Sequence, residues 1–149
     1  MEYRRPVQVL VHAVQHTAGG WYFLMLHRVP GRGSFWQGVS GGAQWGESLE
    51  DAARRELLEE TGLQPIELCY LDFSYTLPMQ ESWKRWYAPG TREIVEHVYL
   101  AIVESQEPVL HSGEHDDWRW CTFEQALALL RFPDNVEALR ICRRSLAQR

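Results

Sequence analysis

The spacing of hydrophobic residues predicts a chain built largely of β-strands. Residues 7–15 and 21–28 are mostly apolar stretches of strand length, and a glycine-rich turn at residues 18–20 separates them, so they are predicted to form a hairpin. Further extended stretches are predicted at residues 35–40, 66–77, 94–103 and 118–121. The stretch at residues 66–77 is long enough for one or two strands.

One internal stretch has the period of an amphipathic helix instead. Its inward positions recur every three or four residues, and Ser48 is a natural N-cap with Asp51 as a weaker capping-box partner. Gly62 is placed to end the helix in a left-handed conformation. The residues that recur at helical spacing are Leu49, Ala52, Ala53, Glu56, Leu57 and Glu60.

Two more helices are predicted at the C-terminal end. Thr122 and Gln125 form a capping box for a helix through about Leu130, and Pro133 opens the last helix. The stripe expected to face the core of that helix is Val136, Leu139, Cys142 and Leu146. Strands interrupted by one helix and closed by others indicate a mixed sheet between helices, in the α/β or α+β class. The Pro-, Gly- and aromatic-rich stretches at residues 29–34 and 80–93 are predicted loops.

The bulk properties bound the function. With 149 residues the chain is predicted to form a single domain, residues 1–149, with a sizeable core. The formal net charge of −5 argues against sequence-independent nucleic-acid binding through a basic surface, so no nucleic-acid partner is expected. It does not exclude a polyphosphate substrate, because bound metal ions supply positive charge locally.

Cysteine usage and the N-terminus bear on the compartment. Cys69, Cys121 and Cys142 are odd in number and widely spaced, which is typical of reduced, packed thiols in a cytoplasmic protein. The apolar stretch near the N-terminus is interrupted by Gln8 and His12, so neither a signal peptide nor a membrane span is expected there.

The candidate chemistry lies on the predicted internal helix. Glu56, Glu59 and Glu60 are spaced three and four residues apart and share one face. Such carboxylates repel one another unless a positive charge lies among them, and Mg²⁺ supplies one while also binding substrate phosphates. Arg55 is a fixed cation that could orient one of the acids. An acidic helix face exposed to solvent has the same composition.

The spacing around these acids resembles the Nudix box, G-x(5)-E-x(7)-R-E-U-x-E-E-x-G-U, where U is aliphatic. The residues that match its fixed positions are Gly41, Glu47, Arg55, Glu56, Leu57, Glu59, Glu60, Gly62 and Leu63. The resemblance implies a Nudix-type α/β/α sandwich with a mixed β-sheet. It also implies hydrolysis of a diphosphate linked to another group, with Mg²⁺ or Mn²⁺ as cofactor.

Outside the box the chain resembles one subgroup, the dihydroneopterin triphosphate pyrophosphohydrolases of folate synthesis. The shared segments are Arg5-Pro6-Val7, Phe35-Trp36-Gln37, residues 86–92, Glu114-His115 and Trp120. This resemblance implies a small-molecule triphosphate or polyphosphate substrate, with dihydroneopterin triphosphate cleaved to the monophosphate and pyrophosphate.

The resemblance also implies a set of site residues. The metal ligands would be Glu56, Glu59, Glu60 and the backbone carbonyl of Ser40. Glu114 matches a late acid that binds another metal ion or activates water, and its alternative is a solvated loop acid. Catalytic roles are expected for Glu59, Glu60, Glu114 and Arg55.

Substrate contacts are expected from basic and aromatic residues. The candidates for phosphate contacts, which could equally be plain surface cations, are Arg4, Arg5 and Arg28. The candidates for stacking on a planar heterocycle, which could equally pack in the core, are Trp36, Tyr87 and Trp86. The histidines lack metal-ligand spacing and are assigned no catalytic role. The oligomeric state is not determined by the sequence.

Two alternatives remain open. One is a nucleotide enzyme of the same family, which cleanses the nucleoside triphosphate pool or cuts dinucleoside polyphosphates and shares every acid named above. The other is a non-catalytic sensor of nucleotide sugars with an appended DNA-binding domain. The intact box and the single-domain length argue against the sensor.

Overall fold

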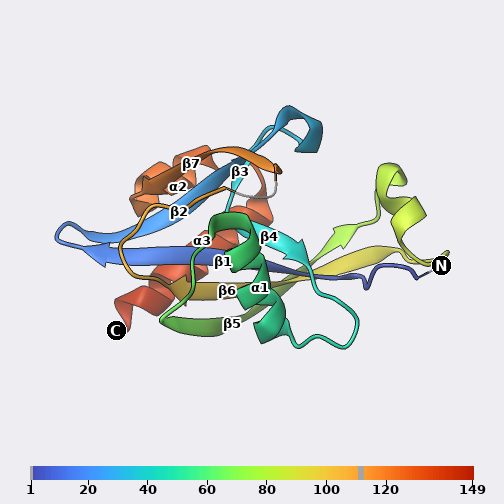
Figure 1. Ribbon diagram of the computed structural model, residues 1–149, viewed down its shortest axis with the longest axis horizontal. Coiled ribbons are helices and arrows are strands. Elements are labelled where there is room, and N and C mark those ends of the chain that lie inside the picture. The colour runs from blue at the N-terminus through green and yellow to red at the C-terminus, as the bar shows by residue number, and fades with distance from the viewer. Residues whose placement is uncertain (1, 111–112) are drawn as a thin grey trace.

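In the computed structural model, which describes residues 2–110 and 113–149, seven strands form one mixed sheet with helices on both faces (Figure 1). The strands are β1 (Val7–Thr17), β2 (Gly20–Arg28), β3 (Trp36–Gln37), β4 (Val39–Gly42), β5 (Glu67–Pro78), β6 (Glu93–Ile102) and β7 (His115–Cys121). Hydrogen-bonded neighbours follow the order β3-β2-β1-β6-β5, while β4 pairs with β1 and β7 pairs with β2. The Nudix-type mixed sheet expected from the sequence is confirmed.

Strand β1 organises the sheet because it pairs with three others. It runs parallel to β6 and antiparallel to β2 and β4. Residues 8–11 of β1 pair with β4, whereas residues 14–17 pair with β2. The C-terminal half of β2 therefore leaves β1 and pairs with β3 and β7 instead. This divergence carries Arg28, at the end of β2, next to His115 of β7.

Helix α1 (Leu49–Thr61) covers one face of the sheet, and α2 (Phe123–Leu129) and α3 (Pro133–Ala147) cover the other (Figure 1). Alternation along β1 separates the two cores, because successive side chains point to opposite faces. Val9 and Val11 pack in the cluster that contains Leu57 of α1, whereas Leu10 packs with Ala138 of α3.

Most of the predicted strands and helices are confirmed, with four differences in detail. The stretch predicted at residues 66–77 forms one strand, β5 (Glu67–Pro78), with an irregularity in its pairing near Asp72, which has a φ of 52°. Residues 35–40 divide into β3 and β4. The predicted loops contain short 3-10 helices, η1 (Pro30–Arg32) and η2 (Glu81–Trp86). On α3, Leu139, Cys142 and Leu146 are buried as predicted, but Val136 is only partly covered.

The three cysteines are free, as predicted. Among the described residues, every helix is too short or too polar to cross a lipid bilayer. Residues 109–114, which the sequence predicts to lead into the strand at residues 118–121, lie partly outside the described residues.

Candidate active site

Helix α1 begins and ends as its sequence predicts. The Ser48 hydroxyl accepts a hydrogen bond of 3.0 Å from the Asp51 amide, and Gly62 has a φ of 73°. The Gly62 amide donates to the Leu58 carbonyl at 2.8 Å. These caps fix the register of the helix, and packing of its apolar face fixes its rotation, so the positions of the acids follow from both.

The carboxyl group of Glu56 packs closely against the backbone of Gly41. Glu56 is 8% exposed and lies over β4, where a Cβ atom on Gly41 would come within 2.4 Å of all three atoms of the Glu56 carboxyl group. Only glycine allows this approach. The Ser40 carbonyl, predicted to be a metal ligand, is one peptide bond from that contact. Burial raises the pKa of Glu56 to about 7, so a nearby cation would stabilise its ionised form.

Arg55 makes hydrogen bonds to three acids of the box. Its Nε and Nη2 donate to the two carboxylate oxygens of Glu47 at 2.8 and 3.0 Å. Its Nη1 donates to Glu56 at 3.0 Å and to Glu59 at 3.2 Å, and Nη2 also reaches the Gly42 carbonyl at 2.8 Å. Paired hydrogen bonds of this kind lock a guanidinium in place, so Arg55 orients Glu56. They also lower the pKa of Glu47.

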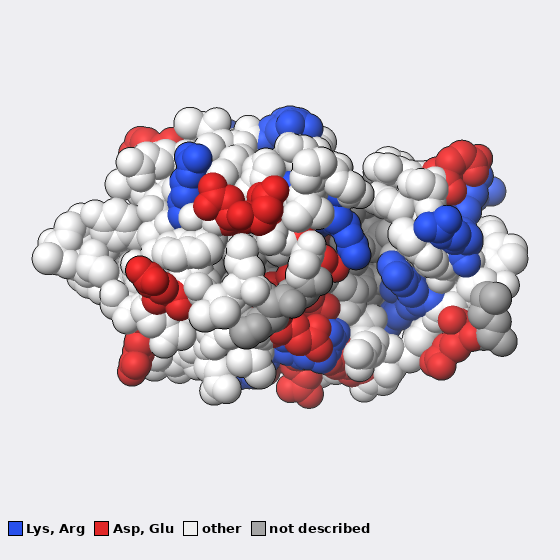
Figure 2. Space-filling model, turned by 45° about the horizontal axis from the view of Figure 1, so that its top comes forward, with Lys and Arg blue, Asp and Glu red and all other residues white. Residues whose placement is uncertain are grey.

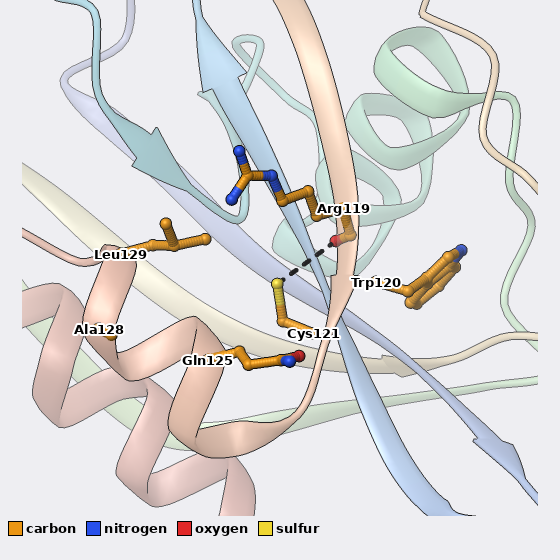
Figure 3. Close-up of a pocket in the computed structure, with 6 residues that line it drawn as sticks. All are labelled: Arg119, Trp120, Cys121, Gln125, Ala128 and Leu129. Atoms are coloured by element: carbon orange, nitrogen blue, oxygen red, sulfur yellow. Dashed lines mark hydrogen bonds between the residues drawn. The ribbon is translucent and has the colours of Figure 1, made fainter.

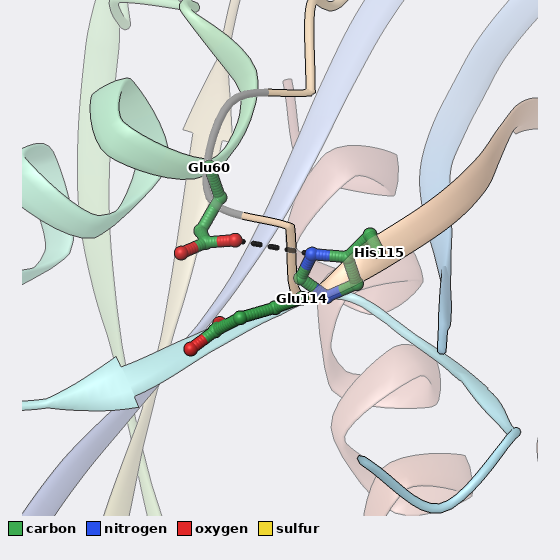
Figure 4. Close-up of side chains that lie close together, drawn as sticks. All are labelled: Glu60, Glu114 and His115. Carbon is green, nitrogen blue, oxygen red and sulfur yellow. Dashed lines mark ion pairs between the residues drawn. The ribbon is translucent and has the colours of Figure 1, made fainter. Parts of the chain in front are cut away.

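A second cluster joins the end of α1 to the start of β7 (Figure 4). The Oε2 of Glu60 lies 3.0 Å from Nδ1 of His115, and both side chains are almost fully buried. Ligand atoms of Glu60, Glu114 and His115 lie within 4.8 Å of one another, which suits a single metal ion. Glu114 also pairs with Arg32 at 3.1 Å. Burial, and then the charge of Glu60, raise the pKa of Glu114.

His115 is a candidate site residue that the sequence analysis missed. The histidines have no metal-ligand spacing along the chain, because the partner of His115 lies on a distant helix. The available signal was its position directly after Glu114. In the described part of the chain neither ring nitrogen of His115 makes a hydrogen bond, although Nδ1 lies close to Glu60. An imidazole so placed can act as a metal ligand or as a positioning group for Glu60.

The predicted metal ligands therefore fall into two groups. Glu56 and Glu59 of α1 lie at Arg55, whereas Glu60, also on α1, lies beside Glu114, which directly precedes β7. The side chain of Glu59 is 53% exposed, and its Oε2 accepts a hydrogen bond from Arg55. This set of carboxylates fits a hard divalent cation such as Mg²⁺ or Mn²⁺, which favours oxygen ligands and polarises phosphate oxygens.

The structure brings three predicted substrate residues beside the box. Arg4, Arg5 and Tyr87 line a cavity of about 600 Å³ together with Arg55 and Glu56. Arg5 donates to the carbonyls of Gln44 and Glu47 at 3.1 and 2.8 Å, so it also holds the loop before α1. In Figure 2 the surface is hollowed between the body of the protein and the end that carries the N-terminus, and basic side chains flank the hollow.

Of the other three predicted substrate residues, Trp86 packs against Arg4, whose guanidinium lies 4.3 Å from the centre of the indole ring, whereas Arg28 and Trp36 lie elsewhere. Nε of Arg28 donates to the Arg32 carbonyl at 2.8 Å. Among the nearby acids, Glu114 has the largest electrostatic effect on the Arg28 guanidinium, and it opposes the lowering of its pKa by burial. Trp36 already has ring partners, since His27 lies at 5.0 Å and the Arg119 guanidinium at 4.6 Å from its ring. Arg28 thus lies beside the cluster of Glu60, Glu114 and His115. Trp36 lies in the short strand β3, where His27 and Arg119 pack against its ring.

A cavity of about 590 Å³ beside β7 and α2 is a separate feature (Figure 3). Its lining includes Arg119, Cys121 and Gln125 but no carboxylate. The Cys121 thiol faces the Arg119 carbonyl at 3.9 Å. Without an acid this cavity offers no site for the divalent metal that the box residues suit.

Comparison with known proteins identifies the family. The family model described as NUDIX domain matches residues 3–141. A dihydroneopterin triphosphate diphosphatase from Haemophilus influenzae is 32% identical over 145 residues, 94% of this chain and 89% of that protein. An RNA pyrophosphohydrolase from Caulobacter vibrioides is 36% identical over 103 residues. The chain spans 60% of that protein and 31% of an octanoyltransferase from Myxococcus xanthus, which is 35% identical over 117 residues.

Solved structures agree as well. A Nudix hydrolase from Listeria monocytogenes superposes with a TM-score of 0.80 at 27% identity, covering 97% of this chain and 96% of the other. The dihydroneopterin triphosphate pyrophosphohydrolase of Escherichia coli gives a TM-score of 0.73 at 27% identity, covering 94% and 96%. With the box, the fold and the family model in agreement over nearly its whole length, the chain belongs to the Nudix hydrolase family.

Proposed function

We propose that this enzyme hydrolyses dihydroneopterin triphosphate to dihydroneopterin monophosphate and pyrophosphate in the cytoplasm, as a step of folate synthesis. Water adds across the anhydride between the first and second phosphorus atoms, the bridging bond breaks, and the proton of water is taken up by base and solvent. The observation that carries the proposal is the similarity to two diphosphatases of this name, which covers 91% and 89% of their length and 92% and 94% of this chain.

The geometry supports the roles of the acids in this reaction. Glu56, Glu59, Glu60 and the Ser40 carbonyl would hold Mg²⁺ or Mn²⁺, with Glu114 as a further ligand or as the base that activates water. The metal would neutralise charge on the phosphates. Arg55 keeps Glu56 in position. Arg4, Arg5 and Arg28 are proposed phosphate contacts, and Tyr87 and Trp36 are proposed to border the heterocycle.

A dinucleoside polyphosphate is the second candidate substrate. The observation that favours it is the likeness to a solved Ap4A hydrolase from Caenorhabditis elegans, with a TM-score of 0.74 at 25% identity and coverage of 96% and 98%. That enzyme class would use the same carboxylates. Only the contacts to the base separate the two candidates.

The deciding experiment is kcat/KM on a panel with Mg²⁺. The panel holds dihydroneopterin triphosphate, the common nucleoside triphosphates, diadenosine tetraphosphate and a 5′-triphosphorylated RNA oligonucleotide. We expect a preference for the pterin of at least ~10-fold, equivalent to about 1.4 kcal/mol in transition-state binding, with pyrophosphate as the primary inorganic product. A comparable preference for another member of the panel, or release of orthophosphate, would overturn the proposal.

A further inference from the structure

The cavity that Arg55 and Glu56 line also has aromatic side chains in its wall. Its volume of about 600 Å³ is in the range typical of small-molecule sites. Among the described residues that line it, the aromatic ones are Tyr3, Trp45 and Tyr87. Tyr87 is only 5% exposed, whereas Tyr3 is 36% and Trp45 57% exposed. Trp45 therefore offers the largest accessible ring to a molecule that enters this cavity.

The indole of Trp45 has no ring or guanidinium stacked on it. In the described part of the chain, none of the aromatic or cation–π contacts includes this residue. The rings of Trp86 and Trp36, by contrast, are covered by the guanidinium groups of Arg4 and Arg119 at 4.3 and 4.6 Å. Tryptophan is highly buried on average in folded proteins. Packing of the fold therefore gives no reason for the exposed indole of Trp45.

The loop between β4 and α1 holds this indole at a fixed distance from the box. Nε1 of Trp45 donates to the Tyr3 carbonyl at 2.6 Å, so the polar edge of the ring already has its partner. The amide of the preceding Gln44 donates to Glu47 at 2.9 Å, and Glu47 in turn accepts from Arg55 at 2.8 Å. Because the ring is ordered before a ligand arrives, binding against it costs little conformational entropy.

We infer that Trp45 is a specificity-determining residue that stacks on the planar heterocycle of the substrate while the phosphates lie at Glu56. Both residues line the same cavity, so one molecule can contact both. An indole attracts flat rings through its π-face and large apolar area. The inference rests on the proposed function only in that the substrate is a polyphosphate attached to such a ring. A stacking surface accepts a pterin or a purine alike.

The test removes the indole and compares ligands with and without a heterocycle. For Trp45→Ala we expect KM for dihydroneopterin triphosphate to rise at least ~10-fold and kcat to change less than ~2-fold, because stacking contributes equally in the ground state and the transition state. Inorganic triphosphate carries the phosphates without the ring. Its inhibition constant, measured against the same substrate at fixed Mg²⁺, should change less than ~2-fold.

Two further variants separate stacking from a structural role. Trp45→Phe keeps an aromatic face but loses the hydrogen bond to Tyr3, and KM should rise less than ~3-fold. Tyr70→Ala removes a ring of β5 that is 40% exposed and lies outside the cavity lining, so it should leave KM unchanged. Three results would overturn the inference: equal losses in the Ala and Phe variants of Trp45, an equal loss in binding of inorganic triphosphate, or an unchanged KM in Trp45→Ala.

The outcomes also separate this inference from the proposed function. If the wild type prefers a nucleotide, the pterin substrate is refuted, and the same variants are then assayed with that nucleotide. A loss that depends on the ring would still assign stacking to Trp45. Conversely, a preference for the pterin that Trp45→Ala leaves intact, with KM unchanged, would refute the role of Trp45 and keep the proposed function.

Discussion

A Cβ atom on Gly41 would lie 2.1 Å from the carboxyl carbon of Glu56. Strand β4 and helix α1 therefore meet at a point where one residue can have no side chain and the other must present a carboxylate. Nη1 of Arg55 donates a hydrogen bond to Glu56 at 3.0 Å and holds the carboxylate there. The contact explains in steric terms why the box combines a glycine with this glutamate.

Gly41→Ala should displace the Glu56 carboxylate, because a contact this short forces one partner to move. We expect kcat to fall at least ~10²-fold, since an electrostatic stabiliser of the transition state leaves its place. The matched control is Gly42→Ala, because a Cβ atom at Gly42 meets nothing within 4 Å. Equal activity of the two variants, measured beside their melting temperatures, would contradict this account.

Glu60→Gln should abolish the response to metal while the protein stays folded. Glu60 is 4% exposed and its carboxylate lies with Glu114 and His115 in the cluster that could hold one metal ion. We expect kcat to fall at least ~10²-fold, and added Mg²⁺ or Mn²⁺ to raise the melting temperature of the wild type but not of the variant. Glu50→Gln, on the exposed first turn of α1, is the control. A full thermal shift in Glu60→Gln would remove Glu60 from the metal site.

Glu114→Ala should lower kcat much more than it raises KM. The residue faces Glu60, and a metal ligand or base acts on the transition state rather than on ground-state binding. Asp116→Ala and Asp117→Ala, which change two exposed acids of β7, should have much smaller effects. Similar small losses in all three variants would return Glu114 to the role of a solvated loop acid.

Glu47→Gln should make the stability of the folded protein less dependent on pH in the acidic range. Arg55 holds the pKa of Glu47 below its ordinary value, so this pair stabilises the folded state above the unfolded pKa of about 4.3. That stabilisation is lost as the pH falls through the lower, folded-state pKa. Melting temperatures between pH 6 and 3 should therefore drop more steeply in the wild type than in the variant. Parallel curves would show that the pair does not couple to folding.

Local geometry made α1 predictable from its own residues. The Ser48 cap, the Gly62 cap and the spacing of Glu56 and Glu60 depend only on helical periodicity, which acts over a few residues. The hairpin of β1 and β2 was predictable for the same reason. The box could therefore be placed on a helix, with its acids on one side, before any tertiary contact was known.

Contacts between distant segments depended on the tertiary structure. His115 reaches Glu60 only because β2 leaves β1 and draws the start of β7 towards α1. Trp45 reaches the Tyr3 carbonyl only because β4 and β1 pair in one particular register, which brings the loop after β4 beside the residues before β1. By itself, then, the sequence determined the helix, its acids and, through the box, the family. Which distant groups complete the site was decided by strand pairing, because register and partner choice are set by packing of the whole sheet.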